Sequence, residues 1–235
     1  MAEIKVAGDI VRPRCVLVTG AYGALGSAVS EAFTRAGYRV VRVNHGAVPA
    51  GPESANAFGI GNLDLSNPQA AVAAVAAALK LLGGLDVVVN VAGGFAWGLL
   101  SEKSIEAWEH LYSLNLRTCL NTCIAALPHL QAGGRIINIG AMAAVQAAAG
   151  MSAYAAAKSC VHRLTESLAA ELQPRSITVN AVLPSTMDTS QNRLAMPDTD
   201  PARWTPPSAV AEVILFLGSP ESQAVNGALI PVGGT

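Results

Sequence analysis

The sequence predicts an α/β protein of one domain, in which helices cover both faces of a doubly wound parallel sheet. Short apolar runs alternate with longer helix-forming runs along the 235 residues, and the first apolar run leads directly into a glycine-rich turn. Hydrophobic residues make up 51% of the chain and charged residues 13%, which allows a large buried core. Alternation of this kind is typical of parallel sheets. Since no repeat or linker divides the chain, we expect one domain over residues 1–235.

Each expected element follows from its own residues. Strands are expected where four to seven mostly aliphatic residues follow one another: Cys15–Thr19, Tyr38–Val43, Leu85–Val91, Arg135–Ile139, Ile177–Leu183 and Ala228–Val232. Helices are expected in the longer runs rich in alanine and leucine: Leu25–Ala36, Pro68–Leu82, Ile105–Leu130 and Ala153–Leu172. The irregular stretch 184–207 follows a strand, at the sheet edge where ligands bind. We interpret it as a lid over the substrate, with an ordinary surface loop as the alternative.

Composition and charge exclude several classes of partner. The formal net charge of -1 gives no broad electrostatic reason to bind nucleic acid or an anionic membrane. Residues 1–14 include Glu3, Lys5 and Asp9 without the apolar run of a signal peptide, and 70–82 is too short for a membrane span. We therefore expect a cytoplasmic protein.

Cysteine and histidine spacing predicts no metal site. The four cysteines are Cys15, Cys119, Cys123 and Cys160, and they form no Cys-x-x-Cys or Cys/His cluster. Cys119 and Cys123 share a helical face, which leaves a redox pair open, but we expect reduced, buried thiols that pack as small hydrophobes.

The glycine turn predicts a nucleotide site of the Rossmann type. Gly20, Gly23 and Gly26 allow a tight turn, a close approach of pyrophosphate and close packing of helix on strand. The first helical amides then point at the phosphates. The expected contacts include the intervening Tyr22, Ala24 and Leu25.

The end of the second strand bears on cofactor choice. Asn44 stands where an acidic side chain commonly binds the adenosine ribose. A neutral amide does not repel a 2′-phosphate, and Arg42 or His45 would supply positive charge. The alternative is that Arg42 points to solvent. We predict NADPH as the cofactor, with NADH possible.

Tyr154 and Lys158 predict the catalytic pair. Four residues apart on a helix, they share one face. We expect the ammonium of Lys158 to lower the pKa of the phenol and prepare it for proton transfer. Either motif alone has a structural explanation, but the glycine turn and this pair together indicate hydride transfer with a proton from Tyr154.

From Cys15 to Val232-Gly233-Gly234 the chain resembles the short-chain dehydrogenase/reductase family. The segment Asn90-Val91-Ala92-Gly93 resembles the family's Asn-Asn-Ala-Gly, and Tyr154 and Lys158 match its catalytic pair. The resemblance implies that Asn115 holds a proton-relay water and that Asp64 lies beside the adenine, Asp64 being open to a helix-capping explanation as well. It also implies the remaining cofactor contacts, which are Leu65, Asn90, Ala92, Gly93, Pro184 and Thr189.

One departure from the family pattern restricts the chemistry. The family's catalytic serine is replaced by Ala141, so no hydroxyl polarises a substrate carbonyl there. Dihydropteridine reductases also lack that serine, and the chain resembles this branch most closely at Gly150–Lys158, Asn192–Asp198 and Trp204–Pro206. That branch carries an aspartate where this chain has Asn44.

The resemblance implies reduction of a quinonoid dihydropterin to a tetrahydropterin. This electron-poor ring accepts hydride readily, so Ala141 would suffice. Phe95, Trp97 and Trp204 are predicted to flank the flat pterin, and core packing is their alternative role. Two alternatives stay open: an NADPH-dependent carbonyl or 3-oxoacyl reductase, and a non-catalytic nucleotide-binding sensor. The long helices 105–130 and 153–172 resemble the family's dimer-forming pair, so we expect a homodimer or homotetramer.

Overall fold

The structure, a computed structural model, describes residues 12–50 and 54–233. The residues before Arg12, on which the expectation about a leader largely depends, lie outside this range, as does Gly234 at the end of the family resemblance. The expected α/β fold with one parallel sheet is confirmed.

Seven strands form one sheet in the order β3-β2-β1-β4-β5-β6-β7, and every neighbouring pair is parallel. The strands are β1 (Cys15–Thr19), β2 (Arg39–Val43), β3 (Ala57–Ile60), β4 (Val87–Asn90), β5 (Arg135–Ile139), β6 (Thr178–Pro184) and β7 (Leu229–Val232). The chain order reverses between β1 and β4, whose carboxyl ends therefore meet at a switch point where such sheets bind ligands. The register pairs Thr19 with both Val43 and Asn90, so these strand ends are level.

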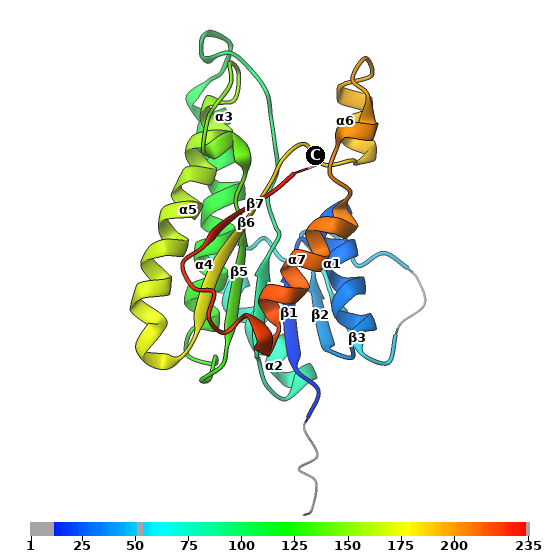
Figure 1. The fold of residues 1–235 in the computed structure, drawn as a ribbon, viewed down its shortest axis with the longest axis vertical. Coiled ribbons are helices and arrows are strands. Elements are labelled where there is room, and N and C mark those ends of the chain that lie inside the picture. The colour runs from blue at the N-terminus through cyan, green and yellow to red at the C-terminus, as the bar shows by residue number, and fades with distance from the viewer. Residues whose placement is uncertain (1–11, 51–53, 234–235) are drawn as a thin grey trace, which may run out of the picture.

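Helices cover both faces of the sheet (Figure 1). They are α1 (Ala24–Arg35), α2 (Pro68–Leu82), α3 (Ile105–Tyr112), α4 (Thr118–Ala126), α5 (Ser152–Leu172), α6 (Ser190–Ala195) and α7 (Pro207–Gly218). The buried faces of α1 and α7 form one core with the sheet, while α2, α4 and α5 form the other. Strands covered on both sides are buried at every position, as β1 and β5 are.

The structure adds three elements that the sequence analysis did not predict. The strand β3 and the helix α7 were missed, and α6 lies inside the stretch 184–207 that was expected to be irregular. The helix expected over 105–130 is divided by a π-helical segment, Ser113–Arg117, and α4 ends at Ala126. A π-helical turn holds one more residue than an α-helical turn, and such turns are frequent at functional sites.

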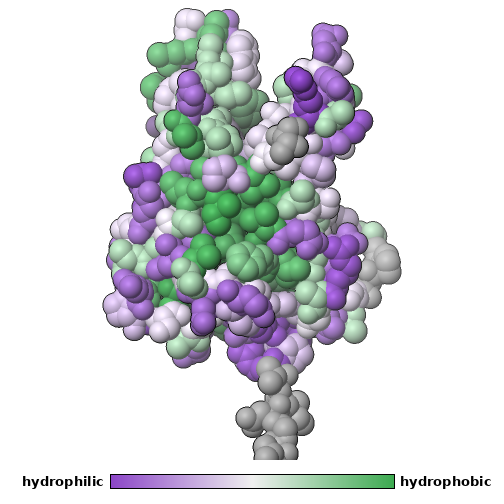
Figure 2. All heavy atoms as spheres, viewed as in Figure 1, coloured by the Kyte–Doolittle hydropathy of each residue, from purple (hydrophilic) through white to green (hydrophobic). Residues whose placement is uncertain are grey.

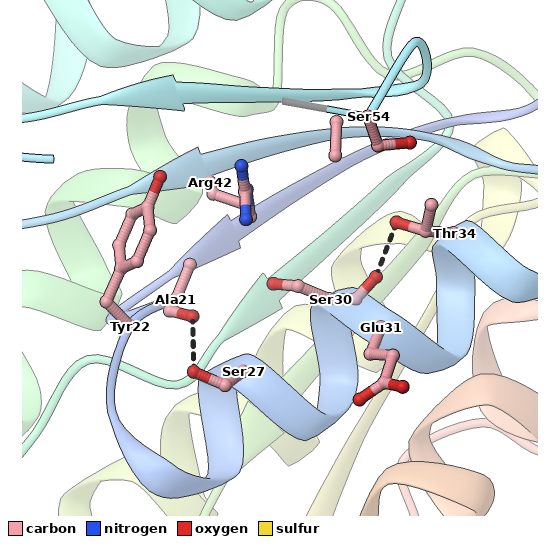
Figure 3. A pocket seen from close by; sticks show the side chains of 9 residues that line it. Ala21, Tyr22, Ser27, Ser30, Glu31, Thr34, Arg42 and Ser54 are labelled. Carbon is pink, nitrogen blue, oxygen red and sulfur yellow. Dashed lines mark hydrogen bonds between the residues drawn. The ribbon is translucent and has the colours of Figure 1, made fainter. Parts of the chain in front are cut away.

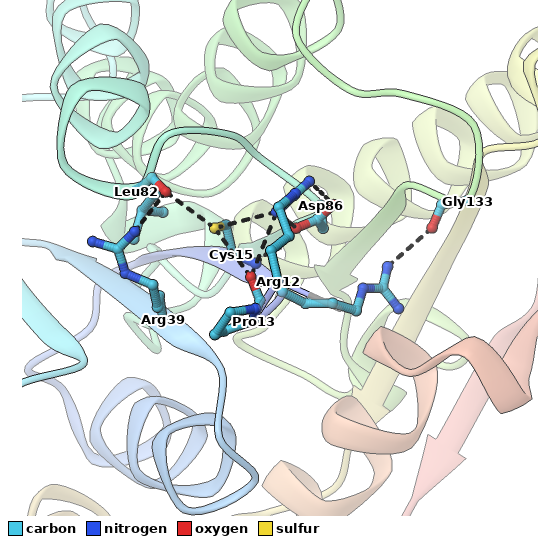
Figure 4. Close-up of polar contacts among 8 residues, drawn as sticks. Arg12, Pro13, Cys15, Arg39, Leu82, Asp86 and Gly133 are labelled. Atoms are coloured by element: carbon cyan, nitrogen blue, oxygen red, sulfur yellow. Dashed lines mark hydrogen bonds and ion pairs between the residues drawn. The ribbon is translucent and has the colours of Figure 1, made fainter. Parts of the chain in front are cut away.

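A polar cluster fixes the edge of the sheet opposite the strand carboxyl ends (Figure 4). The Asp86 carboxylate accepts two hydrogen bonds of 2.8 Å from the Arg12 guanidinium and one from the Cys15 amide. Arg39 donates to the carbonyls of Leu81 and Leu82 at the end of α2. These contacts tie the starts of β1, β2 and β4 together, away from the site described below.

Two arms rise above the strand carboxyl ends and enclose a cleft, which the space-filling view shows as a hollow (Figure 2). One arm carries α3 with the loop before it, and the other carries α6 (Figure 1). The α6 arm is the more hydrophilic of the two in Figure 2. Within the described residues, every helix is too short or too polar to cross a membrane.

Candidate active site

The glycine turn brings the N-terminus of α1 against the end of β1. Gly20 has a φ of +59°, and a Cβ there would lie 2.8 Å from Ala92 Cα. A Cβ on Gly26 would collide with the Gly20 carbonyl. Gly23 caps α1 without a side chain, which leaves room in front of the helix amides of Ala24 and Leu25. This cradle of free amides fits a pyrophosphate.

The residues at the end of β2 lie around the predicted adenosine site. Asn44 donates from Nδ2 to the Ala47 carbonyl at 2.9 Å. His45 is exposed. The Arg42 guanidinium lies 5.1 Å from the centroid of the Tyr22 ring, so it does not point freely to solvent.

Asp64 and Leu65 follow β3 on the same edge. Leu65 is buried, while Asp64 is exposed and its Oδ1 accepts from the Ser66 amide at 2.9 Å. Hydrogen bonds from Ser66 hold the pKa of Asp64 below its usual range. Asp64 does not cap α2, because the cap is Asn67, whose side chain accepts from the Gln69 amide.

The turn after β4 lies between the residues predicted to bind the nucleotide, around β1 and β2, and the predicted catalytic residues on α5. The Ala92 amide donates to Thr19 Oγ1 at 3.1 Å, which joins the ends of β1 and β4. Asn90 is buried and donates to Asn138 Oδ1 at 2.9 Å. A Cβ on Gly93 would lie 2.7 Å from Asn115 Oδ1 and 3.3 Å from Lys158 Nζ. Gly93 is therefore the point where two of the predicted catalytic residues meet.

Asn115 lies in the π-helical segment and is buried. Its Oδ1 accepts from the Gly94 amide at 3.1 Å, and its Nδ2 donates to the carbonyls of Gly94 and Leu111. The side chain thus fixes the turn after β4. Both Nδ2 protons of Asn115 are therefore used within the protein, and only Oδ1 keeps an acceptor site for the water of the predicted relay.

Lys158 is buried and donates from Nζ to the Ile139 carbonyl at 2.8 Å. Burial lowers its pKa to about 8. Burial also raises the pKa of Tyr154 to about 12. The expectation that Lys158 lowers the pKa of the phenol is therefore wrong, because the ammonium bonds to the end of β5 and desolvation dominates the pKa of Tyr154. The phenol is held protonated, as a proton donor must be.

Ala141 occupies the serine position and is buried. Its amide donates to His162 Nε2 at 3.3 Å, and the imidazole fills the space left by Gly140. Burial lowers the pKa of His162, with smaller contributions from Arg163 and Lys158. Sequence reasoning missed His162, although its position one helical turn after Lys158 places it on the same face of α5.

Aromatic side chains border the cleft beside Tyr154. The Phe95 ring packs edge-on against Tyr154 with centroids 5.0 Å apart, and it is 47% exposed. Trp97 is 55% exposed and donates from Nε1 to the Ala149 carbonyl at 3.1 Å. Trp204, in contrast, is only 7% exposed, so in this conformation it packs inside the protein and does not offer its ring to a substrate.

The segment after β6 carries the last predicted residues. Pro184 ends β6 and is buried. Thr189 caps α6, its Oγ1 accepting from the Asn192 amide at 3.1 Å. A bidentate ion pair between Arg193 and Asp188 braces this helix. The structure therefore gives the predicted lid a short helix, and whether it moves stays a prediction.

Other sequence expectations have simpler outcomes. Cys15, Cys119 and Cys123 are buried free thiols, whereas Cys160 is exposed. A hydrogen bond with the adjacent Cys123, together with burial, raises the pKa of the Cys119 thiol, which suits packing better than reactivity.

The site combines a Rossmann sheet with a glycine cradle at its switch point, and it places a tyrosine and a lysine of α5 near the turn after β4. This combination defines a nucleotide-dependent oxidoreductase. The sequence pattern of the family described as short chain dehydrogenase matches residues 14–199. The chain belongs to this family, and it is an NAD(P)-dependent oxidoreductase of that class.

Similar proteins cover nearly the whole chain. The 3-oxoacyl-[acyl-carrier-protein] reductase of Vibrio cholerae is 30% identical over 94% of this chain and 96% of its own. A probable galactose dehydrogenase of Rhizobium meliloti is 32% identical over 95% of both chains. The aldohexose dehydrogenase of Thermoplasma acidophilum superposes with a TM-score of 0.84 at 28% identity, covering 94% of this chain and 92% of that one.

A short chain dehydrogenase from Burkholderia cenocepacia, solved in complex with NADP, superposes with a TM-score of 0.81 at 28% identity over 94% of this chain and 96% of that one. These relatives support the family and the alternative prediction of a carbonyl reductase. They give no support to the closer resemblance to dihydropteridine reductase.

Proposed function

We propose that the protein is an NADPH-dependent reductase of a small carbonyl compound. The observation that carries the proposal is the meeting of Asn115 and Lys158 at Gly93, with Tyr154 one helical turn before Lys158. When bound, the cofactor supplies hydride. Tyr154, protonated at neutral pH, then donates a proton to the oxygen of the reduced group. The names of the relatives, a 3-oxoacyl reductase and two sugar dehydrogenases, support a carbonyl or alcohol as the reacting group.

The chain's own residues suit NADPH. The cradle at Gly20 and Gly26 has room for backbone approach to phosphates and no room for side chains. Lys158 lies where it can turn from the Ile139 carbonyl to a ribose hydroxyl, because its Nζ is close to Gly93. Asn44 brings no negative charge near a 2′-phosphate. Solved relatives with NADP and with NADPH support this choice, and NADH stays a possible second cofactor.

Ala141 restricts the substrate within this class. Without a hydroxyl at this position, one hydrogen bond that would stabilise the developing oxyanion is missing, and such a donor is worth about 10²–10³ in turnover. The substrate must therefore carry a carbonyl already activated by its neighbours. A 3-oxoacyl thioester fits this requirement better than a simple ketone.

Reduction of a quinonoid dihydropterin is the second candidate, and two features favour it. The Ala141 methyl supplies no hydrogen-bond donor where a ketone would need one, and Phe95 presents a half-exposed ring against Tyr154. A flat, electron-poor ring system would stack there without needing the serine.

One assay separates these candidates. The oxidation of NADPH is followed with acetoacetyl thioester, cyclohexanone and quinonoid dihydropterin, each with the wild type and with Ala141→Ser. We expect turnover of the thioester, with an increase in the variant of about tenfold or more. Fast reduction of dihydropterin that Ala141→Ser leaves unchanged would instead establish the second candidate. If no acceptor is reduced while NADPH binds, the protein is a nucleotide sensor.

Assembly into a homodimer or homotetramer is part of the proposal. The helices α3 and α4 expose apolar side chains, including Ile105 at 70%, Tyr112 at 46% and Ile124 at 59%. Light scattering coupled to size-exclusion chromatography measures the mass, and Ile124→Lys is expected to lower it to that of one chain. A wild type that elutes as a monomer at high concentration would contradict this part.

A further inference from the structure

The segment that leaves β5 and enters the cleft is tied to two successive turns of α5. Lys158 Nζ donates to the Ile139 carbonyl at 2.8 Å, and four residues later His162 Nε2 accepts from the Ala141 amide at 3.3 Å. The two side chains share one face of α5 because they are one helical turn apart. They therefore hold the main chain on both sides of Gly140.

The imidazole completes the main chain at the point where it leaves the sheet. The Gly140 amide still donates to the Val182 carbonyl of β6 at 2.9 Å. One residue later, the partner of the Ala141 amide is the imidazole of His162, which is itself buried. A Cβ on Gly140 would collide with Nε2, so the close approach of ring and main chain depends on this glycine. Without the ring, a buried amide would lose its hydrogen bond, which is costly.

The contact between His162 and Ala141 requires a neutral imidazole. Because the Ala141 amide donates, Nε2 must carry a lone pair, and the proton of the neutral ring must lie on Nδ1. A protonated ring would turn an N–H group toward another N–H group, and the hydrogen bond would be lost. Burial, and to a smaller extent the charges of Arg163 and Lys158, hold the pKa of His162 below its ordinary value. The ring is therefore neutral at neutral pH.

Within residues 12–50 and 54–233, the other elements packed against α5 do not control the charge of the ring. From β6, Leu183 faces the same Gly140 and does not titrate. Arg135 begins β5 and Arg175 follows α5, both at ends remote from His162. The helix α3 and the π-helical segment also pack against α5, and their titratable side chains are all exposed: Glu106, Glu109, His110, Tyr112 and Arg117. The pKa of His162 responds to its two charged neighbours on α5 and to none of these groups.

We propose that His162 is a positioning residue of the reaction, which holds the Ala141 main chain as one wall of the substrate site. It acts through Ala141, the residue at the serine position, and touches neither substrate nor cofactor. The Lys158 contact with Ile139 is shared with the cofactor that Lys158 is proposed to bind, whereas the imidazole serves the main chain alone. The inference rests on the proposed reduction, because the substrate site is defined by that reaction.

Two substitutions of similar chemistry test this role. His162→Gln keeps an acceptor at the position of Nε2 and does not take up a proton, whereas the side chain of His162→Asn is one methylene shorter and does not reach the Ala141 amide. His129→Gln is the control for the loss of a histidine, because His129 is exposed and lies beyond the end of α4. Circular dichroism and the unfolding midpoint confirm that each variant folds.

The contact itself is measured without substrate or cofactor. Exchange of the Ala141 amide with solvent is followed by NMR, and the nitrogen shifts of the imidazole report which ring nitrogen carries the proton. We expect an unprotonated Nε2 at neutral pH, slow exchange in the wild type and His162→Gln, and exchange about tenfold faster in His162→Asn. A protonated Nε2, or equal exchange in all three proteins, would overturn the proposal.

The effect on the reaction is measured with NADPH and the acceptor that the wild type reduces fastest. Near neutral pH, kcat/KM for the acceptor should fall by about tenfold or more in His162→Asn and recover in His162→Gln, with the Kd of NADPH unchanged in both. As the pH falls below about 6.5, the wild type and His129→Gln should lose kcat/KM because the imidazole takes up a proton, whereas His162→Gln should keep it.

Two kinetic results would contradict the role of His162: full activity in His162→Asn, or a loss of activity at low pH that His162→Gln retains. A wild type that reduces no acceptor would instead contradict the proposed function. In that case the exchange measurement still decides whether His162 holds Ala141, so the two failures are distinguishable.

Discussion

The carboxyl edge of the sheet has a nucleotide half, around α1, β2 and β3, and a catalytic half, around β4, β5 and α5. The two halves differ in how their polar side chains are hydrogen-bonded within the protein. Around β4, β5 and α5, Asn115, Lys158 and His162 each bond to a main-chain group of a neighbouring segment. Among the described residues, Tyr22, Ser30 and Arg42 around α1 and β2 keep buried atoms without partners (Figure 3), and Asn90 Oδ1 at the end of β4 does so as well. Asn115, Lys158 and His162 are therefore held in place by the protein's own main chain, whereas the polar atoms of Tyr22, Ser30 and Arg42 are not. Catalytic groups gain from such preorganisation.

The largest effect is expected from Tyr154→Phe, which probes the preorganised half. The substitution removes the hydroxyl that donates the proton, while the ring that contacts Phe95 and the side chain of Lys158 stay in place. Turnover should fall by roughly 10²–10⁴-fold with little change in cofactor affinity. Stopped-flow turnover and fluorescence titration of NADPH measure the two quantities, with the exposed Tyr112→Phe as the control. Unchanged turnover would mean that solvent supplies the proton.

Gly26→Ala probes how closely the nucleotide half is packed at its backbone. The added methyl would collide with the Gly20 carbonyl, so the free energy of unfolding should fall by about 3 kcal/mol. Gly23→Ala is the matched control, since its Cβ would meet its nearest neighbour at 3.5 Å, and about 1 kcal/mol or less is expected. Urea unfolding measures both. Equal losses would show that crowding does not distinguish the two glycines.

Asn44→Asp tests whether the charge of the side chain at position 44 sets the choice between NADPH and NADH. The wild type should prefer NADPH moderately, and the new carboxylate should shift preference toward NADH by about 1–3 kcal/mol through repulsion of the 2′-phosphate. The ratio of kcat/KM for the two cofactors measures the shift. Asn67→Asp adds the same charge at the cap of α2 and should leave the ratio unchanged. A wild-type preference for NADH of about tenfold or more would contradict the expectation.

A further prediction concerns the pH dependence that the buried Lys158 gives to stability. Its pKa is about 8 in the folded protein and about 10.5 when unfolded. Because the unfolded chain holds the proton between these values, Lys158 contributes stability that is present above pH 10.5 and is lost as the pH falls through about 8. The difference in unfolding free energy between wild type and Lys158→Met should therefore grow in favour of the wild type as pH rises across this window. Lys80→Met, on the exposed side of α2, should show no such trend.

Much of the fold was predictable because its core strands carry a plain apolar signal. The predicted bounds of β1, β5 and α2 match the structure. The strand β3 was missed because it is a short edge strand, Ala-Phe-Gly-Ile, in which only Ala57 is buried and Gly59 weakens the apolar pattern. The helix α7 was missed because the prolines before it suggested a continuing loop, although proline is well tolerated in the first helical turn.

The site was predictable in its residues and less so in its electrostatics. Spacing alone placed Tyr154 and Lys158 on one face of a helix, which α5 confirms. It did not show that the Lys158 ammonium bonds to the Ile139 carbonyl, because that contact depends on how α5 packs against β5. The burial of Trp204 and the role of His162 beneath Ala141 likewise depend on tertiary packing, which sequence spacing does not encode.

The π-helical segment joins α3 directly to α4, so the orientation of one helix relative to the other depends on the number of residues in the segment. Deleting one residue from 113–117 would let the segment relax to an ordinary α-helix, which rotates everything on one side of it by roughly 100° relative to the other. Asn115 would then leave the turn at Gly94, or α4 would turn its buried face away from the sheet. Insertions and deletions in this segment are therefore more damaging than a substitution at its exposed residue, Arg117.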